Sequence, residues 1–405
     1  MTGASLTIAH VADYVMPAMG YQEFMLAKWN ARHGQQVHML TSDRYTPVPN
    51  YEASWRPILG PRIVGEGVEE IDGVVVHRLP VKVELGRKIW LSGLSREIRR
   101  LSPDIVLCHG TSSPSAFVLP KTCKRLRVPL LMDNHMAFVA QRKGIVGRLG
   151  YMLLRFLTRR TMNGQVSRFL GVGKESCDFL IKEQGVSPGK VGRLDIGVDT
   201  ELFRPDIQAR GRARALYGIP AEAKVVMQTG KLSPDKSPGW LAEATAPIME
   251  RRADVWLVFV GGGAANELEA INGPIVGAGV SDRMRVIPAV ATKQLAEIFN
   301  LADICVYPNA SSLSCMEAAA CGRPVIVTDL PWGKEREKAG VTLCYRTGDT
   351  DDLHRKLEWL LTDDDARNDI GRRARRAVLE RFSYDTIARR SEEIMREAIA
   401  EYGNA

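Results

Sequence analysis

The first residues with the types and spacing to do chemistry are two lysines in the second half of the chain. Lys231 and Lys236 follow Gly230 at the end of an apolar run over residues 224–230, which predicts a buried strand. Each ammonium group is a compact charge with three hydrogen-bond donors, so the pair could converge on a diphosphate. Surface lysines after a strand are also common, and the pair alone leaves both interpretations open.

A second candidate begins at Asn309, after the apolar run over residues 303–308. This segment predicts a short helix that ends at Gly322 and starts near Ser312, Leu313 and Ser314. The unpaired N–H groups and the positive dipole end of such a helix attract anions. Ser314 and Glu317 also have the spacing of a capping box, in which two side chains satisfy the helix start without a ligand. The pattern leaves an anion site and a simple cap as alternatives.

Both candidates depend on strands that end at one edge of a sheet. Apolar runs alternate with helical patterns, which favours an α/β fold with parallel sheets covered by helices on both faces. The expected strands are residues 5–12, 36–42, 74–80, 104–110, 128–135 and 168–173 in the first half, and 224–230, 254–263, 285–290, 303–308 and 323–329 in the second. A turn-rich segment over residues 197–206 predicts a linker between two Rossmann-like domains. Ligands of such sheets bind beyond the carboxyl ends of the strands.

Composition excludes several other classes of protein. The chain has 405 residues, of which 45% are apolar and 25% are charged, as in an ordinary folded protein. No apolar run reaches the roughly 18 residues of a membrane-spanning helix, and no secretory signal is visible. Seven cysteines without a CxxC pair or zinc-like spacing suit reduced thiols in the cytosol. The three aspartates at 363–365 lie between two helical patterns, where capping is favoured over metal binding.

Positive charge is concentrated in one segment. Residues 121–168 hold eleven lysines and arginines and one acid, Asp133. Within it, residues 142–160 form a basic amphipathic pattern whose shared apolar face comprises Leu149, Met152, Leu153, Phe156 and Leu157. Two interpretations are open: a core-facing helix with a basic outer side, or an interfacial helix at an anionic membrane. Nucleic acid is disfavoured as a partner because aromatic residues are sparse here and no nucleic-acid motif occurs.

Several motifs together resemble one family. Glu317-Ala-Ala-Ala-Cys-Gly-Arg-Pro-Val325 resembles the signature of the retaining glycosyltransferases of family 4, which have the GT-B fold of two Rossmann-like domains facing across a cleft. Further segments are similar to other motifs of this family. They are Gly230-Lys231-Leu232 with Lys236, the loop from Phe259 through Gly262 to Gly263, Gly197-Val-Asp199, Phe203-x-Pro205 and Phe382-Ser383. The resemblance covers nearly the whole chain and is strongest over residues 197–330.

Three positions depart from the family pattern. Asn309 stands where the family has a first glutamate, and Lys231 replaces an arginine, which keeps the charge but loses the planar fork. Met19-Gly20 replaces a Gly-Gly loop, and Gly20 can still allow close backbone approach.

The resemblance implies roles for these residues. Residues 1–196 would bind the acceptor, residues 197–380 would bind a nucleoside diphosphate sugar, and a helix over residues 381–405 would pack back on the first domain. Glu317 would bind the ribose, the two lysines and the short helix would hold the diphosphate, and a histidine would lie near the reacting sugar. His135 is that histidine by position, and His109 is the other candidate. The remaining donor-binding candidates are Gly20, Gly230, Gly262, Asn309, Ser312, Leu313 and Ser314.

The expected function is transfer of a sugar, with retention, to a hydroxyl of a lipid-linked or cell-envelope glycan. No metal or other cofactor is expected, and a cytoplasmic location on the inner face of the plasma membrane would suit residues 142–160. The alternatives are a nucleotide-sugar epimerase or a phosphorylase of the same fold, and a polyanion-binding regulatory protein. The sugar, the nucleobase and the acceptor are not specified by the sequence.

Overall fold

The computed structural model describes residues 4–48, 51–136, 144–310 and 312–403. The chain forms two compact units. Unit 1 comprises residues 1–197 and 384–405, and unit 2 comprises residues 198–383. The chain therefore passes from one unit to the other twice.

Unit 1 is built on an eight-stranded sheet in the order β10-β9-β8-β7-β1-β2-β4-β3, counted over the described residues. Neighbouring strands are parallel except at the edge, where β3 runs antiparallel to β4. The strands are β1 (Thr7–Ala12), β2 (Gln36–Ser42), β3 (Gly67–Ile71), β4 (Val74–Leu79), β7 (Ile105–His109), β8 (Leu130–Asn134), β9 (Arg168–Gly171) and β10 (Val191–Arg193). A separate hairpin joins β5 (Val81–Leu85) to β6 (Lys88–Leu91).

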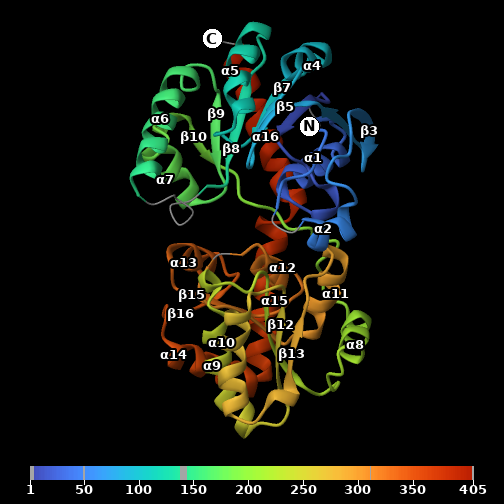
Figure 1. Ribbon diagram of the computed structural model, residues 1–405, viewed down its shortest axis with the longest axis vertical. Helices are drawn as coiled ribbons and strands as arrows, with labels where there is room; N and C mark the ends of the chain where they lie inside the picture. The colour runs from blue at the N-terminus through green and yellow to red at the C-terminus, as the bar shows by residue number, and fades with distance from the viewer. Residues whose placement is uncertain (1–3, 49–50, 137–143, 311, 404–405) are drawn as a thin grey trace. The chain divides into compact units, whose positions relative to one another are not determined.

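Helices cover both faces of this sheet because successive strand residues point to opposite sides. Ala9 and Val11 pack in a core with residues of α4, α5 and α7, whereas Ile8 packs in a second core with α1 and α16. Figure 1 shows α16 passing along the sheet and α6 and α7 at its β9–β10 end. The helices are η1 (Pro17–Met19), α1 (Gln22–Arg32), α2 (Tyr51–Ser54), α3 (Arg56–Leu59), α4 (Leu94–Leu101), α5 (Pro114–Leu126), α6 (Ile145–Thr161), α7 (Lys174–Lys182), η3 (Pro188–Lys190) and α16 (Tyr384–Gly403).

Unit 2 repeats this architecture with a six-stranded parallel sheet in the order β13-β12-β11-β14-β15-β16. The strands are β11 (Lys224–Thr229), β12 (Val255–Val260), β13 (Met284–Ile287), β14 (Ile304–Tyr307), β15 (Val325–Thr328) and β16 (Leu343–Tyr345). The helices are α8 (Ile207–Leu216), η4 (Pro234–Lys236), α9 (Pro238–Arg251), α10 (Ala265–Gly277), η5 (Ser281–Arg283), α11 (Thr292–Leu301), α12 (Ser314–Ala320), α13 (Pro331–Lys338), α14 (Thr350–Thr362) and α15 (Asp364–Arg381).

The expected α/β class with two Rossmann-like units is confirmed. The strands that the sequence did not predict are short or exposed: β3 is exposed over most of its length, and β10 and β16 have three residues each. Asp363 caps α15 by accepting a hydrogen bond from the Ala366 amide at 2.9 Å, as expected for the aspartate triplet. Within the described residues, no helix combines the length and the apolar character that crossing a membrane requires.

Candidate functional site

The loops after β11 and β12 approach each other so closely that only glycine fits at one position. Gly261 has φ +143°, and an added Cβ would lie 1.9 Å from the carbonyl oxygen of Gly230. Gly230 itself has φ +114° and faces the Ser312 hydroxyl. The carbonyl of Gly262 accepts a hydrogen bond from the Leu232 amide at 2.9 Å. A Cβ added at Gly262 would lie in open space. Close packing therefore requires Gly261, whereas the sequence pattern had singled out Gly262.

The two predicted lysines lie on the loop that follows Gly230. Lys231 is exposed, and Lys236 ends the short helix η4 and is half-buried. Burial lowers the pKa of Lys236, and Asp235 opposes that effect. The Lys236 carbonyl accepts a hydrogen bond from the Gln228 side chain at 3.3 Å, which fixes the loop against its strand.

Asn309 connects this loop to the next strand of the sheet. Strands β11 and β14 are neighbours, so the segments that follow them meet at one edge. The Asn309 side-chain amide donates a hydrogen bond to the Ser237 hydroxyl at 3.2 Å. The Asn309 amide therefore bridges the loops that follow these two strands.

The start of α12 differs from the predicted capping box. Leu313 occupies the N-cap position and Ser314 is the first helical residue, so Ser314 does not cap the helix. The Ser312 hydroxyl accepts a hydrogen bond from the Ser314 amide at 3.3 Å instead. The amides of Cys315, Met316 and Glu317 bond to the carbonyls of Ser312 and Leu313. The capping-box prediction is wrong because the chain enters the helix in a tight turn one residue earlier than the pattern assumed.

Glu317 is the carboxylate of this edge. Its side chain is half-buried on the first turn of α12. Burial raises the pKa of Glu317 to about 7, and a hydrogen bond with the Ser314 side chain opposes the rise. A carboxyl with this pKa loses its proton near neutral pH and thereby changes from a hydrogen-bond donor to an acceptor.

A third cation at this edge was not predicted from the sequence. Arg336 on α13 donates a hydrogen bond to the Cys315 sulfur at 2.8 Å and stacks 5.1 Å above the Trp332 ring. Arg336 lies near Lys236, because the positive charge of each side chain acts to lower the pKa of the same thiol, Cys315. No local pattern in residues 331–338 distinguishes Arg336 from an ordinary charge on an exposed helix. It reaches the site only because α13 follows the adjacent strand β15.

The remaining predicted site residues lie in unit 1. Gly20 has φ +66° and ends η1, between β1 and α1. His135 follows β8, and its Nε2 lies 3.6 Å from Oδ1 of Asp133. His109, at the end of β7, makes a 2.6 Å contact between its Nδ1 and Oδ2 of the same carboxylate. The structure thus brings both candidate histidines to one aspartate.

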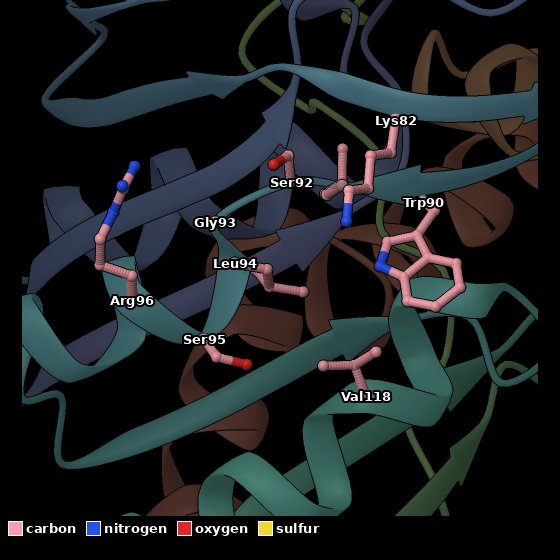
Figure 2. Close-up of a pocket in the computed structure, with 9 residues that line it drawn as sticks. Lys82, Trp90, Ser92, Gly93, Leu94, Ser95, Arg96 and Val118 are labelled. Carbon is pink, nitrogen blue, oxygen red and sulfur yellow. The ribbon is translucent and has the colours of Figure 1, made fainter.

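Unit 1 also contains a pocket of about 190 Å³. Figure 2 shows Lys82, Trp90 and Val118 toward one side of it and Arg96 toward the other. None of the predicted site residues lines it. Among the described residues, no group of histidine, cysteine, aspartate or glutamate side chains could hold a metal ion.

Helix α6 carries the basic amphipathic pattern, apart from residues 142 and 143, which lie outside the described residues. Its inner side packs on α7, where the rings of Tyr151 and Phe179 meet edge to face at 5.7 Å. Its opposite face exposes Ile145, Leu149, Met152, Leu153 and Phe156, each by more than half of its surface. The core-facing interpretation of this stripe is therefore wrong, while Leu157 is half-buried.

Comparison with known proteins identifies the family. Residues 24–202 match the family model described as Glycosyltransferase Family 4, and residues 210–377 match the model described as Glycosyl transferases group 1. The two matches together account for most of both units. The chain belongs to the glycosyltransferases of family 4.

The fold of this family 4 glycosyltransferase is GT-B, as its structural relatives show. HepE from Anabaena, solved in complex with UDP, matches with a TM-score of 0.72 and 16% identity over 97% of this chain and 100% of that one. WaaG, a glycosyltransferase involved in lipopolysaccharide biosynthesis, matches with a TM-score of 0.65 and 17% identity over 96% and 99% of the two chains.

Several sequence relatives of this family 4 glycosyltransferase are named D-inositol 3-phosphate glycosyltransferase. The protein from Saccharomonospora viridis is 31% identical over 56% of this chain and 54% of its own length. The protein from Streptomyces bingchenggensis is 28% identical over 69% of this chain and 64% of its own length. The chain thus spans less than two thirds of either relative.

Proposed function

We propose that the protein transfers a sugar from a nucleoside diphosphate sugar to an acceptor hydroxyl, with retention of the anomeric configuration. The observation that carries the proposal is the meeting of Lys236, Arg336 and Glu317 at the carboxyl edge of the unit 2 sheet. Cations there suit a diphosphate, and a carboxylate suits the hydroxyls of a ribose. HepE, a protein of the same fold, has been solved with UDP and with UDP-glucose.

In this proposal the protein acts mainly by stabilising the leaving diphosphate. Lys231, Lys236 and Arg336 offset the negative charge that grows as the bond to the sugar breaks. A phosphate oxygen then takes the proton of the attacking acceptor hydroxyl on the same face of the sugar. Since side chains supply the positive charge, we expect activity to survive EDTA, and an absolute requirement for Mn²⁺ or Mg²⁺ would contradict this assignment.

We further propose a lipid-linked or cell-envelope acceptor, reached from the cytoplasmic side of the membrane. The five exposed apolar residues of α6 lie within about 100° of arc at 100° per residue. Arg148, Arg159 and Arg160 are exposed beside them. An apolar stripe bordered by cations suits an anionic lipid surface. The name of the sequence relatives favours a second acceptor class, a small phosphorylated polyol.

The membrane proposal has a direct test. Purified protein should co-sediment with vesicles that contain anionic lipid, should sediment less with neutral vesicles, and should be released by high salt. Phe156→Ser with Met152→Ser should weaken binding. Ile207→Ser in unit 2 is the matched control, because Ile207 is 86% exposed on α8 without belonging to this stripe. Equal binding to both lipids, or equal loss in the control, would leave the stripe without this role.

The transfer reaction is tested by incubating the protein with a panel of nucleoside diphosphate sugars and acceptors. Release of nucleoside diphosphate that depends on the acceptor supports transfer, whereas interconversion of the donor alone would indicate an epimerase. Lys231→Ala and Lys236→Ala should each lower kcat/KM about ten- to hundredfold, since a charge-assisted contact contributes about 1.5–3 kcal/mol. Lys224→Ala is the control, because Lys224 starts β11 at the opposite edge and pairs with Asp364. Normal turnover in both site variants would refute the assignment.

A further inference from the structure

Four side chains form a continuous polar chain across three neighbouring strands of unit 1. His10 lies on β1, His109 ends β7, Asp133 lies on β8, and His135 directly follows β8. His109 and Asp133 are register partners, so their side chains project on the same side of the sheet. His10 Nδ1 lies 3.0 Å from His109 Nε2, and His109 Nδ1 lies 2.6 Å from Asp133 Oδ2. The mechanism proposed above uses none of these four side chains, and the family resemblance places only the last of them, His135, near the reacting sugar.

The chemistry of the carboxylate fixes the direction of one hydrogen bond in this chain. A carboxylate only accepts hydrogen bonds, so His109 must donate to Asp133 from Nδ1. Nε2 of His109 and Nδ1 of His10 lie at hydrogen-bond distance, so one of these two nitrogens donates to the other. Burial lowers the pKa of His10 to about 3, which keeps that ring neutral. The two inner histidines therefore act as a fixed support for Asp133.

The other oxygen of Asp133 is directed toward the outer histidine. Oδ1 accepts a hydrogen bond from the Gly110 amide at 3.0 Å and lies 3.6 Å from Nε2 of His135. The Asp133 side chain is 1% exposed, whereas the His135 side chain is 34% exposed. Burial alone would raise the pKa of Asp133, but the facing His109 and His135 hold it well below its usual range. Asp133 is thus a buried carboxylate that faces an accessible imidazole.

The turn that carries His135 is also fixed. The Asn134 side-chain amide donates to the carbonyls of Met136, at 3.1 Å, and Ser176, at 3.4 Å. Its side-chain oxygen accepts from the Met136 amide at 3.3 Å. The backbone on both sides of His135 is therefore held in place, and the ring orientation is left to Asp133.

We propose that Asp133 is a positioning residue, supported by His109 and His10, which fixes the orientation of His135 and keeps it positively charged. The catalytic part of this inference rests on the proposed function. In that reaction the charged His135 would donate a hydrogen bond to an oxygen of the transferred sugar or of the acceptor. A charged imidazole has no lone pair and cannot act as a general base. The proton of the acceptor must then leave by way of the diphosphate.

The groups that face His135 support this charge. Burial acts to lower the pKa of His135, but the charge and hydrogen bond of Asp133 outweigh it, and Glu23 on α1 adds to the effect, so that the pKa is raised to about 9. His109 affects His135 through the shared carboxylate. In a histidine without such partners the pKa is about 6.5.

The first experiment measures the ionisation of His135 directly, by NMR titration of protein labelled in the histidine rings. In the wild-type protein the His135 signal should titrate near pH 9, and in Asp133→Asn it should move down by two or more pH units. Asparagine keeps an oxygen for the Gly110 amide. His109→Asn places an amide donor near the position of Nδ1 and should largely preserve the titration, whereas His109→Leu removes a hydrogen bond from the buried carboxylate and should move the His135 signal to higher pH.

The matched control is His38→Gln. His38 and His77 form a second histidine pair in the same sheet, with Nδ1 and Nε2 3.1 Å apart, on β2 and β4. This substitution should leave the His135 signal unchanged. If Asp133→Asn does not fold, the wild-type titration and the two His109 variants still decide the question. A His135 signal that titrates at the same pH in the wild type and in the folded variants would overturn the proposal.

The second experiment is the pH dependence of turnover. Wild-type kcat should fall as the pH rises through about 9, because the charged form of His135 is lost. With a pKa near 6.5, only about 3% of the imidazole is charged at pH 8, so Asp133→Asn should be about thirtyfold slower there and near normal at pH 6. Turnover that instead rises with pH through 9 would make His135 a base and overturn the assignment. A protein without transferase activity would refute the proposed function but leave the NMR result intact.

Discussion

Replacing Glu317 with glutamine separates the cost of burying this carboxylate from its use in binding. Burial raises the pKa of Glu317 from 4.5 to about 7. A carboxyl shifted this far destabilises the folded state by roughly 3 kcal/mol at high pH. Because the side chain is only half-buried, solvent screening reduces this to about 1–2 kcal/mol. Glutamine does not ionise and avoids this cost.

The sign of the effect follows from proton binding. The folded protein binds more protons at Glu317 than the unfolded chain does between pH 4.5 and 7, so stability falls as the pH rises through this range. The destabilisation caused by burying the ionised Glu317 is absent below about pH 4.5 and complete above about pH 8. Glu317→Gln should therefore melt like the wild type at pH 4.5 and about 2–8 °C higher at pH 8, at about 2–4 °C for each kcal/mol.

The ionised carboxylate, which lowers stability, should strengthen the binding of UDP. At pH 8 the ionised carboxylate forms charge-assisted hydrogen bonds with a ribose, and Glu317→Gln should bind UDP about tenfold more weakly, a difference of about 1.4 kcal/mol. At pH 5.5 the two proteins should bind alike. Melting curves and calorimetric titrations at both pH values measure the two effects, and Glu269→Gln, at an exposed position on α10, is the control. A Glu317→Gln protein that melts earlier at every pH yet binds UDP normally would show that the residue is structural.

Three further pairs of substitutions test the site and the packing of unit 2. Gly261→Ala should lower the melting temperature by several degrees, since its Cβ would meet a carbonyl at 1.9 Å, whereas Gly262→Ala, which faces open space, should not; differential scanning fluorimetry compares the two. Arg336→Ala should weaken UDP binding about tenfold or more by calorimetry and Arg336→Lys less so, and equal affinity in all three proteins would remove Arg336 from the site. Arg214→Met breaks a buried ion pair and should cost about 3–5 kcal/mol in urea unfolding, against less than about 1 kcal/mol for the exposed Arg212→Met.

The sequence predicted what depends on local pattern. The runs at 224–230 and 254–263 became β11 and β12 because uninterrupted apolar residues suit strands that are buried on both faces. The periodicity of α6 correctly placed Leu149, Met152, Leu153 and Phe156 on one face, but it included the half-buried Leu157 and omitted Ile145. It could not tell whether that face is covered, because covering depends on neighbours that are distant in the sequence.

The parts that were missed depend on such distant neighbours. Ser314 and Glu317 satisfy the capping-box spacing, yet the turn at Ser312 and Leu313 shifts the helix start by one residue. His10 lies inside an apolar run and carries no signal of its own. Its contact with His109 arises only because the parallel sheet places β1 beside β7.

The two crossings between the units have a consequence for the order of folding. Val198 pairs with Ser383, so unit 2 begins and ends at one place and is continuous in sequence. Unit 1 is not, because one of its cores takes Tyr384, Ile387, Ala388 and Met395 from α16 and packs them against α1. A ribosome makes these residues only after the whole of unit 2. We therefore expect unit 2 to complete its core from its own continuous segment, while unit 1, although it is made first, remains incomplete until α16 docks.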